Sequence, residues 1–468
     1  MAAGAATGTD GAAARAGHPR GLYYLAFTEA WERFSYYGMT ALLVLYMVNQ
    51  LLLPGHVENI AGFASFRGFV EGMYGPLSGQ ALASAIFGLY AGFVYFTPVL
   101  GGLIADRWIG QRNAVVIGAL CMCAGHVAMA FDQSFLLALQ LLVIGSGFLK
   151  GNISAQVGAL YPRDDEAGRA RGFVIFSTAI NIGAVGGPIL CGYLAARYGW
   201  HWGFGVAAIF MAGGLLTYLA GYRHLPARAG RAERVREPLT RGDWKKVAAI
   251  AAVLAITTLH SLAYDQLFNV LPVWVQGHVD LSPGGFEIPV PWFQSADALA
   301  SILCVPLLLA TWTRMARRGA EPDDMGKLVL GAVLIAVSNL MLAAAILVSG
   351  DGPVSAWWPL LYCLCTGTSF MIWWPTMLAL VSRAAPVPIN ATMMGVAFLN
   401  PFVAGVGTGW IGTYYEALGP LAFWLLNAGI AAAGALLMLA AARPLGRALA
   451  AGGPEEPVRP RPATERER

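Results

Sequence analysis

The sequence contains twelve long apolar stretches separated by short polar connections. About 20 apolar residues in a helix are enough to cross the hydrocarbon core of a bilayer. The stretches cover residues 22–50, 81–105, 113–131, 135–158, 172–195, 202–222, 246–275, 290–313, 326–348, 356–383, 388–414 and 420–442. Only 12% of the residues are charged, against about 25% in soluble domains, which excludes an ordinary soluble enzyme. We predict an all-α membrane protein with twelve transmembrane helices.

The positive residues fall almost entirely on one side of such a twelve-helix arrangement. Of the 30 Lys and Arg, 26 lie in segments that share a side with the two termini, and only Arg67 and Arg197 lie on the other. Cytoplasmic loops carry this excess of Lys and Arg. We therefore expect a multi-pass protein of the cell membrane with both termini in the cytoplasm. The charges lie in short loops and form no continuous patch, so we expect no nucleic-acid partner.

The most basic connection, residues 223–245, divides the predicted spans into six and six. We expect it to be a cytoplasmic linker between two six-helix bundles, residues 21–222 and 246–445. The ends of the chain, residues 1–20 and 446–468, are poor in large apolar residues, and we expect disordered cytoplasmic tails.

A polar loop between the second and third spans reads GGLIADRWIGQR. This loop resembles the signature of the major facilitator superfamily. It contributes Gly102, Asp106, Arg107, Gly110 and Arg112 to that signature. The resemblance implies two bundles that rock about a central cavity, with this loop taking part in the conformational change.

Motifs of enzyme and metal sites are missing from the sequence. It has no HExxH, GxSxG or GxxxxGK[ST] motif, and its six cysteines fall inside predicted spans without CxxC spacing. We therefore expect no enzymatic activity, no metal and no cofactor.

Ionisable residues inside predicted spans are costly and therefore point to function. The first span contains EAWERFSYYG, in which spacings of three and four place Glu29, Glu32, Arg33, Tyr36 and Tyr37 on one broad helical face. This face cannot point at lipid, so we predict that it lines a cavity. A purely structural ion pair is the alternative.

Other ionisable residues lie on later spans. Lys150 lies on the fourth span, Asp265 on the seventh and Asp297 on the eighth. The alternative for Lys150 is that its side chain snorkels to an interface. His126 and His260 are weaker candidates, and we expect them to be packing or hydrogen-bonding residues.

The motif ExxERFxYYG resembles the proton-dependent oligopeptide transporter family, also called the peptide transporter family. Further segments resemble motifs of this family between about residues 20 and 445. They are FLKGNIS (148–154), FSTAINIG (176–183), YGWHWGFG (198–205), AYDQ (263–266), PWFQSAD (291–297) and NATMMG (390–395). The resemblance implies a proton-driven symporter of di- and tripeptides, with protons as the coupling ion. We expect the protein to be a monomer.

The resemblance also implies roles for individual residues. Proton coupling would involve Glu29, Glu32, Arg33, Lys150 and Asp265, with Asp265 bridging to the gate on the outer side. Substrate binding would involve Arg33, Tyr36, Tyr37, Tyr90, Lys150, Asn181, Trp292, Asp297 and Trp374. A substrate carboxylate and a glutamate would compete for the same cation, which couples protonation to substrate binding.

Three departures from the family pattern bear on the substrate. The connection at 223–245 is too short for the two extra helices that bacterial members insert between the bundles. The acid of the family's GExxxSP motif is Phe370 here, and the small residue before its proline is Trp374. The Asn of WFQSxN is Asp297. Asp297 either replaces the lost acid or stays protonated and acts like the Asn.

Two other functions stay open at this point. One is a proton-coupled carrier of another small anion or zwitterion, which the loss of the acid at Phe370 favours. The other is a membrane receptor or scaffold that transports nothing. The charged residues inside the predicted spans argue against this alternative.

Overall fold

The computed structural model describes residues 18–162, 165–226 and 238–450. Its helices are α1 (Arg20–Tyr46), α2 (Phe63–Tyr74), α3 (Gly79–Ile104), α4 (Gln111–Ala128), α5 (Phe135–Ala159), α6 (Glu166–Tyr198), α7 (Trp200–Gly221), α8 (Arg241–Tyr264), α9 (Val270–His278), α10 (Trp292–Arg317), α11 (Asp324–Ser349), α12 (Trp357–Ala384), α13 (Asn390–Ala397), α14 (Asn400–Gly412) and α15 (Tyr415–Ala450). The strands β1 (Val279–Asp280) and β2 (Val354–Ser355) form a short parallel pair. The prediction of an all-α protein is thus confirmed apart from this pair. The larger part of each predicted tail and the middle of the linker lie outside the described residues.

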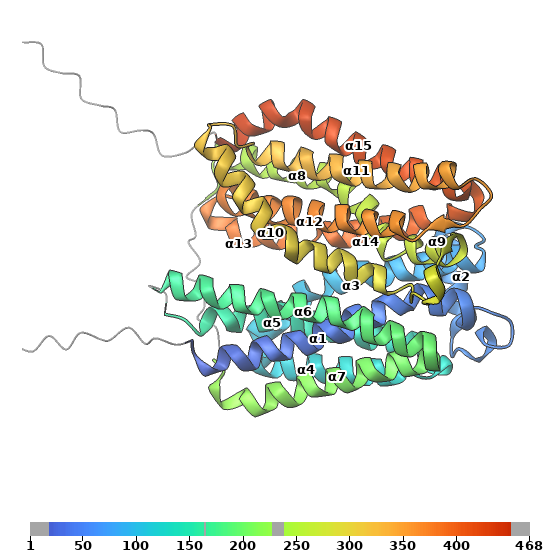
Figure 1. The fold of residues 1–468 in the computed structure, drawn as a ribbon. Helices are drawn as coiled ribbons and strands as arrows, with labels where there is room; N and C mark the ends of the chain where they lie inside the picture. Colours follow the sequence, from blue (N-terminus) through green and yellow to red (C-terminus); the bar gives the residue numbers. More distant parts are fainter. Residues whose placement is uncertain (1–17, 163–164, 227–237, 451–468) are drawn as a thin grey trace, which may run out of the picture.

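The long helices form two groups (Figure 1), and each group has its own apolar core residues. Helices α1 and α3–α7 form one group, and α8, α10–α12, α14 and α15 form the other. The first core consists of buried residues between Leu22 and Leu225, and the two cores of the second group lie between Ile250 and Met438. We call these groups the N-bundle and the C-bundle.

Ten helices of the described chain are long and apolar enough to cross a membrane. They coincide with ten of the twelve predicted stretches. The other two stretches correspond to α1 and α4. Helix α1 is made less apolar by Glu29, Glu32 and Arg33, and α4 begins with polar residues. Both helices nevertheless pack against candidate spans, α1 against α6 and α7, and α4 against α5.

Two of the predicted spans are interrupted in the structure. The predicted span 246–275 is interrupted by a 3-10 turn at Asp265–Leu267. Beside this turn, the amides of Gln266 and Asn269 donate to the Thr408 carbonyl, at 3.2 and 3.1 Å. The predicted span 388–414 divides into α13 and α14 before Pro401, which lacks the N–H that a continuous helix requires.

The amphipathic helix α2 is not predicted by the sequence pattern. Its inner face buries Phe63 and Val70, while Arg67 and Glu71 form an exposed ion pair at 2.9 Å. Hydrogen bonds from Arg67 and from the backbone N–H of Leu77 hold the pKa of Glu71 below its usual range.

The bundles contact each other at the end of the molecule where α2 and α9 lie, which we call the far end (Figure 1). The Ser295 hydroxyl donates to the Val185 carbonyl at 2.8 Å, and the Trp292 indole donates to the Ile189 carbonyl at 3.0 Å. The opposite end, where α7 ends and α8 begins, is called the linker end.

Candidate functional site

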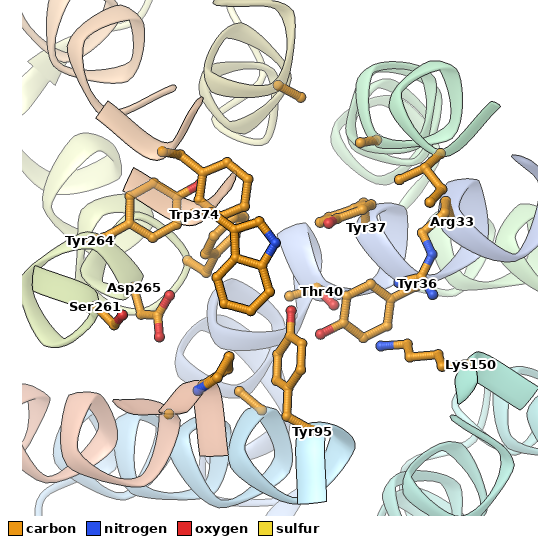
Figure 2. A pocket seen from close by; sticks show the side chains of 18 of the residues that line it. Arg33, Tyr36, Tyr37, Thr40, Tyr95, Lys150, Ser261, Tyr264, Asp265 and Trp374 are labelled. Atoms are coloured by element: carbon orange, nitrogen blue, oxygen red, sulfur yellow. The ribbon is translucent and has the colours of Figure 1, made fainter. Parts of the chain in front are cut away.

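A cavity of about 710 Å³ lies between the two bundles. Its wall extends from Thr40 and Gln294 to Ser154 and Phe398, which lie closer to the linker end. Figure 2 shows side chains from both bundles converging on this space. Nine residues that the sequence singles out line it: Glu29, Arg33, Tyr36, Tyr37, Lys150, Asn181, Asp265, Asp297 and Trp374.

Arg33 holds two glutamates on the N-bundle wall. Its Nε lies 2.8 Å from Oε1 of Glu29 and 2.8 Å from Oε2 of Glu32, and the contact with Glu29 has hydrogen-bond geometry. Glu29 and Arg33 are four residues apart and so lie on the same face of the helix. Glu32 is adjacent to Arg33 in the sequence and reaches the same Nε. Glu29 and Arg33 line the cavity, whereas Glu32 is fully buried beneath them. The expectation that Glu32 itself lines the cavity is not met in this conformation, and its role in proton coupling stays a prediction.

Lys150 points into the cavity instead of toward an interface. Its Nζ lies 4.0 Å from the ring centroid of Tyr36 and 5.2 Å from that of Tyr95. Among the described residues, Nζ has no hydrogen-bond or ion-pair partner. The aromatic faces stabilise the cation while leaving its N–H donors unused. Lys150 is therefore a cation available to an anionic group of a ligand (Figure 2).

Tyr95, and not Tyr90, forms the aromatic wall on α3. Tyr90 is 4% exposed, packs in the N-bundle core and does not line the cavity. Phe87, Ala91, Tyr95 and Pro98 do line it, and their spacing of three to four residues defines one face of α3. This spacing is the signal that could have identified Tyr95.

Asp297 faces the cavity with both carboxylate oxygens engaged. The Tyr264 hydroxyl donates to Oδ2 at 3.0 Å, and the Thr366 hydroxyl donates to Oδ1 at 2.8 Å. Asp265 lies at the 3-10 turn after α8 and also lines the cavity. No hydrogen bond joins Asp265 to another side chain of the described residues, so the expected bridge to the outer gate is absent from this conformation.

Aromatic rings cover the C-bundle wall between these acids. The Phe370 ring stacks on Tyr264, with centroids 5.4 Å apart and planes at 21°, and on Trp374, at 6.2 Å and 9°. His260 stacks on Trp373 at 4.4 Å, and its Nε2 lies 2.9 Å from the Ser369 hydroxyl. His260 thus has a packing and hydrogen-bonding role. The sequence does not reveal that these rings form one stack.

The remaining predicted residues lie outside the cavity. Trp292 lies at the far-end contact, where its indole donates to the Ile189 carbonyl. The expectation that it binds substrate directly is not met in this conformation.

In the facilitator-like loop, Asp106 and Arg107 are exposed, and Gly110 adopts a φ of 78° at the turn into α4. The Arg112 guanidinium lies 5.1 Å from the Tyr222 ring centroid. Gly102 lies in the last turn of α3, just before this loop.

The described residues contain no group of three His, Cys, Asp or Glu side chains that could hold a metal ion. The cavity lining itself places Arg33, Lys150 and Glu29 on the N-bundle wall and the carboxylates of Asp265 and Asp297 on the C-bundle wall.

Comparison with known proteins gives a consistent result. The model of a family described as the Major Facilitator Superfamily matches residues 33–408. A peptide transporter of Yersinia enterocolitica is 29% identical over 88% of this chain and 91% of its own. A di-/tripeptide transporter of Lactococcus lactis subsp. cremoris is 29% identical over 82% of this chain and 87% of its own.

Solved structures agree with these relatives. A peptide transporter POT crystallised with sulfate has a TM-score of 0.81 and 26% identity, over 94% of this chain and 97% of its own. A POT family transporter in complex with 5-aminolevulinic acid has a TM-score of 0.79 and 25% identity, over 92% and 98%. The resemblance drawn from the motifs is confirmed by these matches.

Proposed function

We propose that this chain, which belongs to the Major Facilitator Superfamily, is a proton-coupled symporter that imports di- and tripeptides or peptide-like compounds. The observation that carries the proposal is the charge arrangement of the cavity. Arg33 is shared by two carboxylates while Lys150 has no partner among the described residues. The names of the relatives support the same substrate class.

The residues couple protonation to binding by competition for Arg33. Protonation of Glu29 or Glu32 removes one negative partner from Arg33. The guanidinium then becomes available, together with Lys150, to the substrate carboxylate. The Asn181 amide offers hydrogen bonds to the peptide backbone, and Tyr36, Tyr37 and Tyr95 contact the substrate from the same wall. Opening of the far end then requires the Ser295–Val185 and Trp292–Ile189 hydrogen bonds to break.

The topology belongs to the same proposal. We place twelve spans in the membrane, with α1 and α4 added to the ten apolar candidates, and both termini and the linker in the cytoplasm. The described conformation then has its cavity extending toward the cytoplasm. The transporter works as a monomer, with protons as its only coupling ion, without a cofactor and without enzymatic activity.

A test compares Glu32→Gln with Glu287→Gln, a matched change at an exposed loop glutamate. In proteoliposomes, Glu32→Gln should abolish dipeptide accumulation driven by a pH gradient and retain exchange of substrate across the membrane without a gradient. Glu287→Gln should behave like the wild type. Gradient-driven accumulation by Glu32→Gln at the wild-type level would contradict the proposal.

The complex of a related transporter with 5-aminolevulinic acid supports a second candidate substrate class. That compound carries an amine and a carboxylate without being a peptide.

A further inference from the structure

Asp297 is a buried carboxylate that has no cation beside it. It lies on α10, and no Lys, Arg or His side chain of the described residues forms an ion pair with it. Arg33 and Lys150 belong to the opposite wall of the cavity. A buried carboxylate without a cation is costly, and the cost falls when the group takes up a proton.

The other titratable side chains around Asp297 are neutral phenols and thiols. Helix α6, which also packs against α10, contributes none of them among the described residues. The titratable groups that interact with Asp297 are Tyr37 of α1, Tyr264 of α8, Cys304 of α10, and Tyr362 and Cys363 of α12.

The hydrogen bonds of Asp297 fit both of its protonation states. The Thr366 Oγ1 lies 2.8 Å from Oδ1 of Asp297 and 3.0 Å from the Cys363 carbonyl oxygen. A hydroxyl has a single hydrogen, so it donates fully to only one of these two acceptors. When Asp297 is ionised, Thr366 donates to Oδ1. When Oδ1 carries a proton, it donates to Thr366, which then donates to Cys363. The Tyr264 hydroxyl donates to Oδ2, at 3.0 Å, in both states.

Asp297 also lies where solvent reaches it from the cavity. Asp297 lines the cavity, whereas Thr366 is buried behind it. The same turn of α10 carries Ser295, which holds the helix against the N-bundle through the Val185 carbonyl. In this conformation the cavity extends toward the linker end. Breaking the Ser295 contact opens the far end beside Asp297, so that the carboxyl is exposed to each side of the membrane in turn.

We propose that Asp297 and Thr366 form a second proton site, on the C-bundle wall, so that each transport cycle carries one proton there in addition to the proton taken by the glutamates beside Arg33. On loading, the carboxylate takes a proton from solvent in the cavity, and the Thr366 hydroxyl turns from Oδ1 to the Cys363 carbonyl. Release into the cytoplasm reverses both changes. This inference rests on the proposed function, because it adds a proton to the same symport.

Asp297→Asn tests the inference, because an amide makes the hydrogen bonds of the protonated acid and cannot lose the proton. In proteoliposomes with the membrane potential clamped at zero, the ratio of proton to dipeptide flux should be lower by one proton than in the wild type. With a gradient of one pH unit, steady-state accumulation of the dipeptide should then fall about tenfold. Asp351→Asn, at an exposed loop aspartate, is the matched control and should keep the wild-type ratio.

A second readout does not depend on transport. The infrared spectrum of the purified wild type should contain a carboxylic acid C=O band that disappears as the pH is raised and that Asp297→Asn lacks. Thr366→Val, which leaves the carboxyl in place, should shift the pH at which this band disappears. An unchanged flux ratio for Asp297→Asn, or bands that neither variant alters, would overturn the inference. Uptake by the wild type without proton flux would instead contradict the proposed function.

Discussion

Arg33 is the residue on which the charge balance of the cavity depends. It is 9% exposed, and its two carboxylate partners are 2% and 0% exposed, so its removal leaves two buried carboxylates without their cation. Loss of one partner of a buried ion pair costs about 3–5 kcal/mol. Arg33→Ala should therefore lower the melting temperature in detergent. Adding Glu32→Gln to Arg33→Ala should restore part of the loss.

The exposed pair Arg67–Glu71 provides the control for this prediction. Such a surface pair contributes about 0–1 kcal/mol, so Arg67→Ala should leave the melting temperature nearly unchanged. Equal losses for Arg33→Ala and Arg67→Ala would contradict a structural role for the shared guanidinium.

A second prediction concerns Lys150 and its contribution to binding of the substrate carboxylate. A hydrogen bond to a charged group contributes about 1.5–3 kcal/mol. Lys150→Ala should thus weaken binding of a free dipeptide about 10- to 100-fold, while affinity for the C-terminally amidated dipeptide, which lacks the carboxylate, should change little. Lys245→Ala, at an exposed lysine, should change neither. If Lys150→Ala weakens both ligands equally, Lys150 does not bind the carboxylate.

Most of the ionisable residues of the cavity can be predicted from the sequence, because a charge buried in a membrane costs free energy and is kept only where it has a role. That cost indicates Glu29, Arg33, Lys150, Asp265 and Asp297, all of which line the cavity. It cannot determine which face of a helix an uncharged residue occupies. Tyr90 is implied by the family resemblance alone, whereas the structure places Tyr95 on the cavity wall.

At the scale of elements, length and hydropathy predict the helices but not their interruptions. The break at Asp265–Leu267 lies beside polar contacts with another helix, in which the Gln266 and Asn269 amides donate to the Thr408 carbonyl. Such contacts join residues distant in sequence. Helix α2 is not predicted because its twelve residues, some of them polar and exposed, are too few to form a membrane span.

Helix α1 packs closely against α6 at Gly183, and this contact gives a third prediction. A Cβ at Gly183 would lie 2.5 Å from the Ala30 carbonyl oxygen and 2.7 Å from the Arg33 Cβ. Gly183→Ala should therefore lower the melting temperature and reduce uptake, because α1 must shift together with Arg33. Gly213→Ala on α7 is the control, since nothing lies within 4 Å of its Cβ position. Equal stability of the two variants would contradict the close packing.

At the scale of the whole molecule, the two bundles are in contact at the far end while the cavity extends toward the linker end. A Cβ at Gly192 would lie 2.7 Å from the Pro291 Cβ, so Gly192→Val should disfavour far-end contact. A Ser154→Cys reporter in a variant without native cysteines should react with a thiol reagent through the cavity. Adding Gly192→Val should slow that reaction. An unchanged or faster rate would contradict the assignment of the closed end.

The central claim is that the cavity couples proton entry to substrate entry. Its most direct test is simultaneous measurement of proton and substrate fluxes into proteoliposomes that hold the purified chain, with a panel of dipeptides and small zwitterions outside. The account predicts that at least one compound accumulates above its external concentration when the outside is acidic, that protons enter with it, and that a protonophore abolishes the accumulation. Uptake of the same extent with and without the proton gradient would contradict it.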